Sequence, residues 1–217
     1  MARVSQEHLD ARRRQILDGA ANCFARNGFH ATSMQDVLKE VDLSAGAVYR
    51  YFSGKEELIA AIVTEVLGTL RGVYERAALE SPPPLPDELV GRIFAHLTRE
   101  RPTVTDGGEW LFPRLMVQVW TETLRNDELS AVLSEGFAEV RAAWVKVVVR
   151  YQENGMMRDD VDPDAVARTL IATAQGLGVQ YALFGGFSTE ALQAGMRGLL
   201  SMREADDGTG NQSVKSG

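Results

Sequence analysis

The sequence is poor in the residues that most often build disulfides, metal centres and catalytic sites. Its 217 residues include one cysteine and three histidines. A single cysteine excludes an internal disulfide and any metal site with several cysteine ligands. His8, His30 and His96 show no metal-ligand spacing, and neither a Gly-rich phosphate loop nor a nucleophile elbow is present. We therefore expect no metal, no cofactor and no catalytic residues, and an enzyme is the weaker alternative.

Long hydrophobic runs are also missing. No stretch of about 18 apolar residues occurs, and no basic segment precedes an apolar stretch in the manner of a secretion signal. We therefore expect a cytoplasmic protein with no membrane partner. No segment alternates as a β-strand would, and there is no internal repeat, while the 45% hydrophobic content is ample for a folded core. These observations predict an all-α chain of one or two domains.

Residues 32–52 read as two short helices joined by a tight turn. Ser33 can cap the first helix together with Asp36 three residues later, and Ser44 can cap the second. Asp42 lies in the turn between them. Two short helices in this arrangement indicate a helix-turn-helix, the motif with which many transcription regulators contact DNA.

The second of these helices has an inner and an outer face. Val48 and Phe52, four residues apart, can pack inward together. The outer face is left with small residues and two long donors: Ser44, Ala45, Gly46, Tyr49 and Arg50. Small residues allow close approach to a groove, and Tyr and Arg can reach phosphates. The alternative is an ordinary helical hairpin whose Tyr49 and Arg50 cover its surface.

The segment before the motif has the pattern of an amphipathic helix. Residues 7–27 place apolar side chains on one face, at Ile16, Ala20, Cys23 and Phe24. Asn27-Gly28 is a helix-stop signal, and Phe29 can anchor the loop that follows. We expect Cys23 to be a buried thiol rather than a redox sensor.

The segment after the motif is predicted to begin a long helix at Ser53-Gly54-Lys55-Glu56, which we interpret as a capping box. Lys55 would then lie in the first helical turn, where a cation opposes the helix dipole. This unfavourable interaction would be offset if the Lys55 ammonium faced a DNA phosphate. A solvated surface lysine is the alternative.

Residues of about 10–63 resemble the DNA-binding domain of the TetR family of bacterial one-component regulators. The resemblance rests on Ile16-Leu17, Ala20, Phe24, Gly28-Phe29, Ala31-Thr32-Ser33, Asp36-Val37, the run from Leu43 to Phe52, and Lys55-Glu56-Glu57-Leu58. It implies phosphate contacts from Thr32, Ser44, Tyr49 and Lys55, with base reading near Ala45, Gly46 and Arg50. Together with Ser33, these residues are the expected DNA-binding set.

The sequence departs from the family pattern at the turn. Asp42 occupies a position usually held by Gly, and Leu38 and Val41 stand where the family commonly has Ala. Asp adopts the left-handed conformation less readily than Gly, so we expect slight strain at Asp42 without loss of DNA binding.

The net charge of −7 is unevenly distributed. Residues 1–55 hold eight Lys or Arg and six Asp or Glu, a net +2, which leaves −9 for the remainder. We expect the acidic part to face away from DNA. Arg12, Arg13 and Arg14 form a basic run at the start of the first helix and can contact the DNA backbone.

The rest of the chain reads as a helical body. Residues 81–86, rich in proline, predict an extended connection after the long helix. Further helices are expected at residues 87–101, 108–124, 127–154, 163–184 and 189–204, the fourth beginning at Asp162-Pro163. The expected architecture has about nine helices: a three-helix DNA-binding domain (1–54), a helical ligand-binding and dimerisation domain (55–205), and a disordered tail (206–217).

Aromatic and methionine side chains concentrate in this body. We expect a ligand cavity lined by Trp110, Phe112, Met116, Trp120, Phe137, Trp144, Tyr151 and Tyr181. The alternative is that they simply form the core. Acidic residues among them, Glu109, Glu122 and Glu139, make a lipophilic cation a sensible ligand.

The last two predicted helices, residues 163–184 and 189–204, carry apolar stripes beside small residues. The stripes comprise Val166, Leu170, Thr173, Leu177, Gln180 or Tyr181, and Phe184, and then Leu192, Met196, Leu199 and Leu200. We expect them to form a homodimer interface, since a helix-turn-helix reads paired half-sites. An intramolecular core face is the alternative.

The family resemblance also implies a mechanism. A dimer would occupy a palindromic operator of double-stranded DNA, block transcription, and be released when a small-molecule effector enters the C-terminal domain. An activator uses the same DNA-binding head, so the sequence does not separate the two. A small-molecule-binding protein without DNA function is a further alternative.

Overall fold

The computed structural model describes residues 6–100, 111–186 and 188–200. Within these ranges the chain forms α-helices and no β-strand, as predicted. The nine described helices are α1 (Gln6–Asn27), α2 (Met34–Val41), α3 (Ala45–Tyr49), α4 (Lys55–Ala77), α5 (Pro86–Glu100), α6 (Phe112–Thr123), α7 (Asp127–Glu153), α8 (Pro163–Phe184) and α9 (Thr189–Leu200). The expected tail lies outside the described residues.

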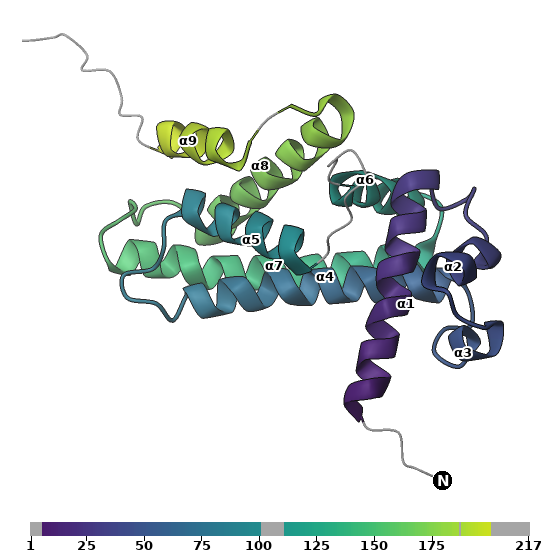
Figure 1. The fold of residues 1–217 in the computed structure, drawn as a ribbon. Helices are drawn as coiled ribbons and strands as arrows, with labels where there is room; N and C mark the ends of the chain where they lie inside the picture. The colour runs from purple at the N-terminus through teal and green to yellow at the C-terminus, as the bar shows by residue number, and fades with distance from the viewer. Residues whose placement is uncertain (1–5, 101–110, 187, 201–217) are drawn as a thin grey trace, which may run out of the picture.

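The helices are arranged around two long members, α4 and α7, which pack along each other (Figure 1). Helix α8 packs on α6 and α7, and α9 packs on α5. Helix α1 crosses α4 near the N-terminal end of α4, and α2 packs against α1, with α3 beside it (Figure 1). One buried apolar cluster runs through all of these elements. Because α4 contacts both α1 and α7, the division of the chain after residue 54 remains a prediction.

Local capping explains the bounds of the helix-turn-helix. The Ser33 hydroxyl accepts a hydrogen bond from the N–H of Asp36 (3.3 Å), and the Asp36 carboxylate accepts one from the N–H of Ser33 (2.9 Å). The Ser44 hydroxyl accepts a bond from the N–H of Ala47 (3.3 Å) and caps α3. Both predicted caps are confirmed.

The predicted capping box of α4 was wrong by one residue. Gly54 is the N-cap and offers no side chain, while Ser53 donates from its N–H and its hydroxyl to the carboxylate of Glu57, at 2.7 and 2.9 Å. Both bonds run from Ser53 to Glu57, and Glu56 takes no part in them. Gly54 has an extended backbone and lies between Ser53 and the first helical residue. The glutamate that accepts from Ser53 is therefore Glu57, one residue later than predicted.

Asp42 ends α2 in the left-handed conformation, with φ 52° and ψ 49°. Its N–H donates to the carbonyls of Leu38 and Lys39, which closes the last turn of the helix. The turn strain expected from the sequence is therefore located in this backbone.

Asp42→Gly is expected to raise the free energy of unfolding by about 0.5–1 kcal/mol, because glycine adopts a positive φ without steric cost. Asp42→Ala is the matched control and is expected to lower it, since alanine keeps the Cβ and lacks the tolerant carboxylate. Chemical denaturation of the three proteins measures both changes. Equal stability of the glycine and alanine variants would contradict the assignment of strain to Asp42.

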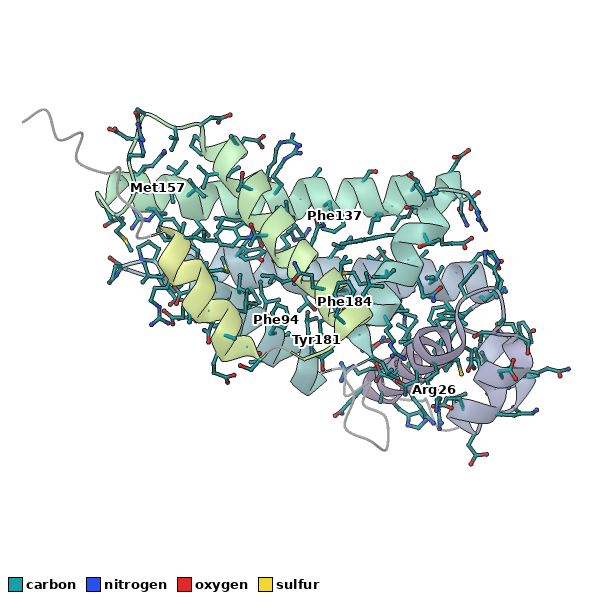
Figure 2. The ribbon with its side chains drawn as sticks, turned by 90° about the horizontal axis from the view of Figure 1, so that it is seen from above. Arg26, Phe94, Phe137, Met157, Tyr181 and Phe184 are labelled. Carbon is teal, nitrogen blue, oxygen red and sulfur yellow. The ribbon has the colours of Figure 1, made fainter. Side chains whose placement is uncertain are left out.

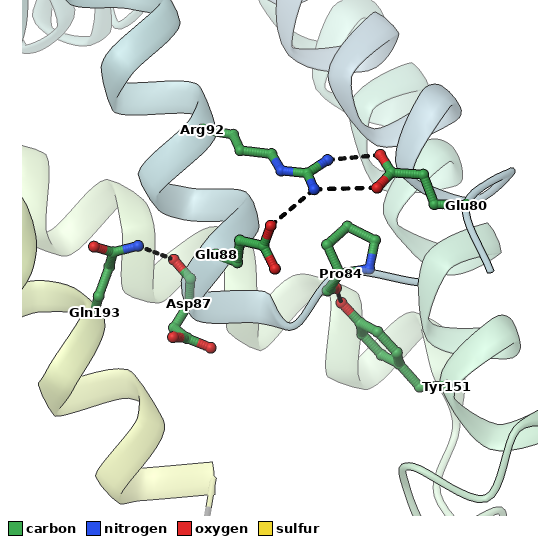
Figure 3. A network of polar contacts seen from close by, with 7 residues as sticks. All are labelled: Glu80, Pro84, Asp87, Glu88, Arg92, Tyr151 and Gln193. Atoms are coloured by element: carbon green, nitrogen blue, oxygen red, sulfur yellow. Dashed lines mark hydrogen bonds and ion pairs between the residues drawn. The ribbon is translucent and has the colours of Figure 1, made fainter. Parts of the chain in front are cut away.

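Polar contacts fix α5 against its neighbours (Figure 3). Gln193 of α9 donates to the carbonyl of Asp87 (3.2 Å), and the buried carboxylate of Asp87 accepts from Arg197 of α9 (3.0 Å). The hydroxyl of Tyr151 in α7 donates to the carbonyl of Pro84. These contacts attach α9 to α5, and the Pro-rich connection to α7.

None of the helices in the described ranges has the length and apolar character needed to cross a membrane.

Candidate DNA-binding surface and ligand cavity

Helix α3 presents the small and donor-bearing residues together, as the sequence predicted. Val48 and Phe52 are buried, at 0% and 3% exposure, and pack α3 onto the core. The exposed residues lie on the other side: Ser44, Ala45, Gly46, Tyr49 and Arg50. We call this set the α3 face. It combines a close-approach surface with two long donors, which is an arrangement suited to a DNA groove.

Two members of the expected DNA-binding set point inward instead. The Thr32 side chain is buried, and its hydroxyl donates to the carbonyls of Gly28 (2.8 Å) and Cys23 (3.2 Å). The ammonium of Lys55 donates to the carbonyls of Phe29 (3.1 Å) and Thr32 (3.3 Å). Both side chains therefore hold the α1–α2 connection, whereas Ser33 is exposed beside it.

The basic run at residues 12–14 is divided among three environments. Arg13 pairs with Glu65 of α4 and lies over the ring of Phe52, 5.4 Å from its centroid. Arg12 donates to Gln15 (2.8 Å), and Arg14 is exposed. Arg13 thus joins α1 to α4.

Ser33 and Ser53 perturb the carboxylates to which they donate hydrogen bonds. Hydrogen bonds from the hydroxyl and N–H of Ser33 hold the pKa of Asp36 below its ordinary value, and the N–H and hydroxyl of Ser53 do the same for Glu57. A lowered pKa in the folded state means that the stabilisation is complete at neutral pH and declines as the pH falls through that pKa. Both carboxylates therefore accept these hydrogen bonds in their charged form at neutral pH.

A cavity of about 140 Å³ lies among α4, α5, α6, α7 and α8. Its walls are aliphatic and aromatic, with Gln175 as the amide among them. The lining side chains are Ile62, Val63, Val66, Leu67, Leu70, Tyr74, Val90, Ile93, Phe94, Leu97, Phe112, Pro113, Leu115, Met116, Val119, Trp120, Leu133, Phe137, Val140, Ile171, Ala174, Gln175 and Gly178. Figure 2 shows Phe94 and Phe137, which reach it from α5 and α7.

Four of the eight predicted ligand residues line this cavity: Phe112, Met116, Trp120 and Phe137. Trp144 and Tyr151 are not among the lining residues. Trp144 packs on Tyr74 of α4, and the Tyr151 hydroxyl donates to the carbonyl of Pro84. Tyr181 is half-buried away from the cavity walls, and Trp110 lies outside the described residues. Ligand contact by Trp144, Tyr151 and Tyr181 is therefore not supported by the lining of this cavity and stays a prediction.

Sequence reasoning missed the contributions of α4 and α5. Ile62, Leu67 and Val90 are ordinary core residues by pattern, and nothing in their spacing distinguishes a cavity wall from a packed core. Tyr74 also lines the cavity and packs on Trp144, with ring centroids 4.5 Å apart. Burial raises the pKa of Tyr74 well above its ordinary value, so its hydroxyl stays neutral.

The acidic residues expected to attract a cation lie elsewhere. The carboxylate of Glu122 is 2.9 Å from Nε2 of His30, a residue of the α1–α2 connection. Glu139 is exposed and pairs with Arg71 of α4. Glu109 lies outside the described residues, as does Trp110. The described glutamates therefore give the cavity no negative wall, and a cationic effector stays a prediction without support from Glu122 or Glu139.

Helix α6 links the cavity to the DNA-binding helices. Its residues Met116 and Trp120 line the cavity, while Glu122 approaches His30. Gln118 lies against Gly28, where an added Cβ would stand 3.6 Å from its side chain. Helix α4 makes a second link, since it lines the same cavity and packs on α1.

The apolar stripe predicted on α8 faces the protein's own core. Leu170 is buried, and Val166 and Leu177 pack against the core cluster. The outward face instead carries small residues and ends in Leu183 and Phe184, which are 63% and 79% exposed (Figure 2). On α9, Leu192 and Met196 are buried against α5, whereas Leu199 and Leu200 are exposed. Leu170, Leu192 and Met196 are therefore buried within the chain itself, and the dimer interface stays a prediction.

The described residues contain no cluster of three or more His, Cys, Asp or Glu side chains that could hold a metal ion. Cys23 is buried, as predicted, and burial raises the pKa of its thiol. A thiol of this kind is a poor nucleophile at neutral pH.

Comparison with known proteins identifies the family. The family model for bacterial regulatory proteins of the tetR family matches residues 16–62, and the model for the C-terminal part of BetI-type transcriptional repressors matches residues 108–202. The chain is 32% identical to HTH-type transcriptional repressor Rv1474c of Mycobacterium tuberculosis over 178 residues, which is 82% of this chain and 86% of the relative.

Two further relatives agree. HTH-type transcriptional repressor AcnR of Corynebacterium diphtheriae is 30% identical over 176 residues, covering 80% of this chain and 82% of the relative. The structure of Salmonella enterica GusR superposes with a TM-score of 0.68 at 29% identity, covering 93% of this chain and all of that one. The chain therefore belongs to the TetR family of bacterial transcriptional regulators.

Proposed function

We propose that this chain is a repressor that binds a palindromic operator as a dimer and leaves it when a small lipophilic molecule enters the cavity. The observation that carries this proposal is the position of the cavity. Its walls include α4 and α6, and both helices also contact α1 of the DNA-binding part. A molecule that displaces either wall therefore moves the α3 faces relative to each other.

The size of the cavity supports a release mechanism. A volume of about 140 Å³ is close to that of an engineered protein cavity that holds one benzene molecule. Any larger ligand must push the walls apart, and it can do so only by favouring the expanded conformation. A coupling free energy of about 1–3 kcal/mol would lower operator affinity about 5- to 150-fold.

The lining of the cavity favours a neutral lipophilic ligand. Transfer of an ion into an apolar site without a counter-charge is strongly unfavourable. Gln175 offers one amide, which can donate to or accept from a ligand hydroxyl or carbonyl. The repressors among the relatives support the sign of regulation that we propose.

The proposed dimer uses the outward faces of α8 and α9. Gly176 and Gly195 are open on these faces, since an added Cβ at either would meet no atom within 4 Å. Small residues permit close approach of helices, and the exposed Phe184 and Leu199 supply apolar area beside them. We expect a mass twice that of the chain in solution at micromolar concentration. A monomer there would contradict the dimer.

The experiment that tests the function has two stages. Genomic fragments captured by the purified protein and sequenced should yield one inverted repeat with half-sites about 34 Å apart. In vitro transcription from a promoter that carries this site should fall when the protein is added. Capture of no common sequence would refute DNA binding, and a rise in transcription would replace the repressor by an activator.

Three probes of similar size test the ligand class: benzyl alcohol, benzylammonium and benzoate. At about ten times its Kd, a ligand of the folded state raises the free energy of unfolding by about 1.4 kcal/mol, which is about 3–6 °C in Tm for a chain of this size. We expect such a shift with benzyl alcohol alone among the three. Ala174→Phe, which fills the cavity, should abolish it. A shift with benzylammonium only would favour a cationic effector.

A further inference from the structure

Tyr74 brings a buried phenolic hydroxyl to the wall of the cavity. It is 4% exposed and is the last of the cavity-lining residues of α4, which follow one another along a single face of that helix. Two other lining side chains carry hydrogen-bonding groups, the indole N–H of Trp120 and the amide of Gln175. The remaining lining side chains are hydrocarbon or thioether. A hydroxyl in such surroundings is unfavourable unless it has a hydrogen-bond partner.

The oxygen and the proton of this hydroxyl stand in different situations. A hydrogen bond from the side chain of Trp144 in α7 opposes part of the rise that burial causes in the pKa of Tyr74. An indole has an N–H donor and no acceptor, so the phenolic oxygen accepts in this pair and the phenolic proton is left to donate. Among the described residues, no acceptor for this proton is found.

Tyr151 shows how the same chain accommodates a buried phenol that serves the fold. It is 1% exposed, it does not line the cavity, and its hydroxyl donates to the backbone carbonyl of Pro84. Tyr74 differs in that it faces the cavity and lacks such an acceptor within the described part of the chain. Since buried polar groups nearly always have a partner, a donor left over beside a cavity points to a partner inside it.

We propose that Tyr74 is a specificity-determining residue that donates a hydrogen bond to an oxygen atom of the ligand. The ligand would then be a neutral lipophilic molecule with an acceptor, such as a carbonyl, ether or hydroxyl oxygen. A pure hydrocarbon of the same shape would leave the donor unpaired. The proposal rests on the proposed function, in which a small lipophilic molecule enters this cavity, and it adds the polar group by which that molecule is recognised.

Two probes of the same shape isolate this hydrogen bond. Acetophenone has a carbonyl oxygen where α-methylstyrene has a methylene group, so acetophenone alone can accept from Tyr74. Tyr74→Phe removes the hydroxyl and keeps the ring that packs on Trp144. Measured by titration calorimetry, this change should raise the Kd of acetophenone about fivefold, the usual effect of one hydrogen bond, and leave that of α-methylstyrene within about twofold.

Tyr151→Phe is the matched control, because it removes the same atom from a buried phenol away from the cavity. It should leave the Kd of both probes within about twofold. Weakening of both probes to the same extent by Tyr74→Phe would give Tyr74 a structural role only and overturn the proposal. If Gln175→Met weakened acetophenone binding and Tyr74→Phe did not, the amide would be the donor and the proposal would also be overturned.

The infrared carbonyl stretch of bound acetophenone gives a readout that does not depend on affinity. A donated hydrogen bond weakens the C=O bond, so the stretch should lie at a lower frequency in the wild type than in Tyr74→Phe. Equal frequencies in the two proteins would mean that Tyr74 does not donate to the carbonyl, whatever the change in Kd.

These outcomes separate the proposal from the function on which it rests. If both probes bind the wild type and Tyr74→Phe does not discriminate between them, the cavity still takes a ligand and only the role of Tyr74 fails. If neither probe binds the wild type at millimolar concentration, the proposed release by a small lipophilic molecule fails as well. Capture of genomic fragments tests DNA binding independently of both.

Discussion

Trp144→Ala is expected to lower the free energy of unfolding by about 3–5 kcal/mol, the range for truncating a large buried aromatic side chain. The indole is 1% exposed and packs on Tyr74, with ring centroids 4.5 Å apart. Its removal leaves a void between α4 and α7, the two longest helices of the described fold. Chemical denaturation measures the change, with the slope against denaturant checked for two-state behaviour.

Trp120→Ala is the matched control, because Trp120 is the described tryptophan that lines the cavity. It is only partly buried, so its truncation should cost less stability. It enlarges the cavity and should alter binding of benzyl alcohol more than Trp144→Ala does. If Trp144→Ala abolished probe binding and left stability unchanged, Trp144 would be a ligand residue, as the sequence predicted.

The helix-turn-helix could be predicted closely because its determinants are local. Ser33 with Asp36, and Ser44, are caps whose partners lie within three residues, so spacing along the chain is enough to place them. The burial of Val48 and Phe52 followed from helical periodicity alone. The left-handed turn at Asp42 followed from the family resemblance, because the family usually has Gly at this position.

The cavity could be predicted only in part, because the composition of a segment does not give the direction of its side chains. Phe137 and Trp144 are aromatic residues of the same helix, seven positions apart. Nothing in their spacing shows that one meets a cavity and the other packs on Tyr74. That difference is set by α4 and α5, which come from distant parts of the sequence.

The same reason explains which contacts the sequence missed on α8 and at the start of α4. The regular stripe of α8 was a real apolar face, but its partner proved to be the chain's own α6 and α7. The carbonyl partners of Lys55, at Phe29 and Thr32, lie 26 and 23 residues earlier in the chain, so the sequence did not predict these contacts. Long-range hydrogen bonds to backbone atoms leave no pattern in a single sequence.

Arg50→Ala is expected to raise the operator Kd by about 30-fold or more. The side chain is exposed on the α3 face, and no hydrogen bond to it is found within the described part of the chain. Removing one arginine from a base or phosphate costs about 1–3 kcal/mol, and a dimer bears this cost in both half-sites, so the total is about 2–6 kcal/mol. Fluorescence anisotropy at fixed salt, with labelled operator, measures the change.

The salt dependence of the same variant shows what Arg50 touches on the DNA. If Arg50 reads a base, Arg50→Ala should weaken binding to the operator far more than binding to unrelated DNA. If it binds a phosphate, the variant should weaken both equally and lower the salt slope by about 1.8. Arg76→Ala at the end of α4 removes the same charge from an exposed position and should leave Kd within about twofold. Ala45 and Gly46 carry no side-chain donors, so Arg50 is the residue of the α3 face best able to hydrogen-bond to a base edge. An operator Kd that is unchanged in Arg50→Ala would instead mean that the protein discriminates sequences through DNA shape.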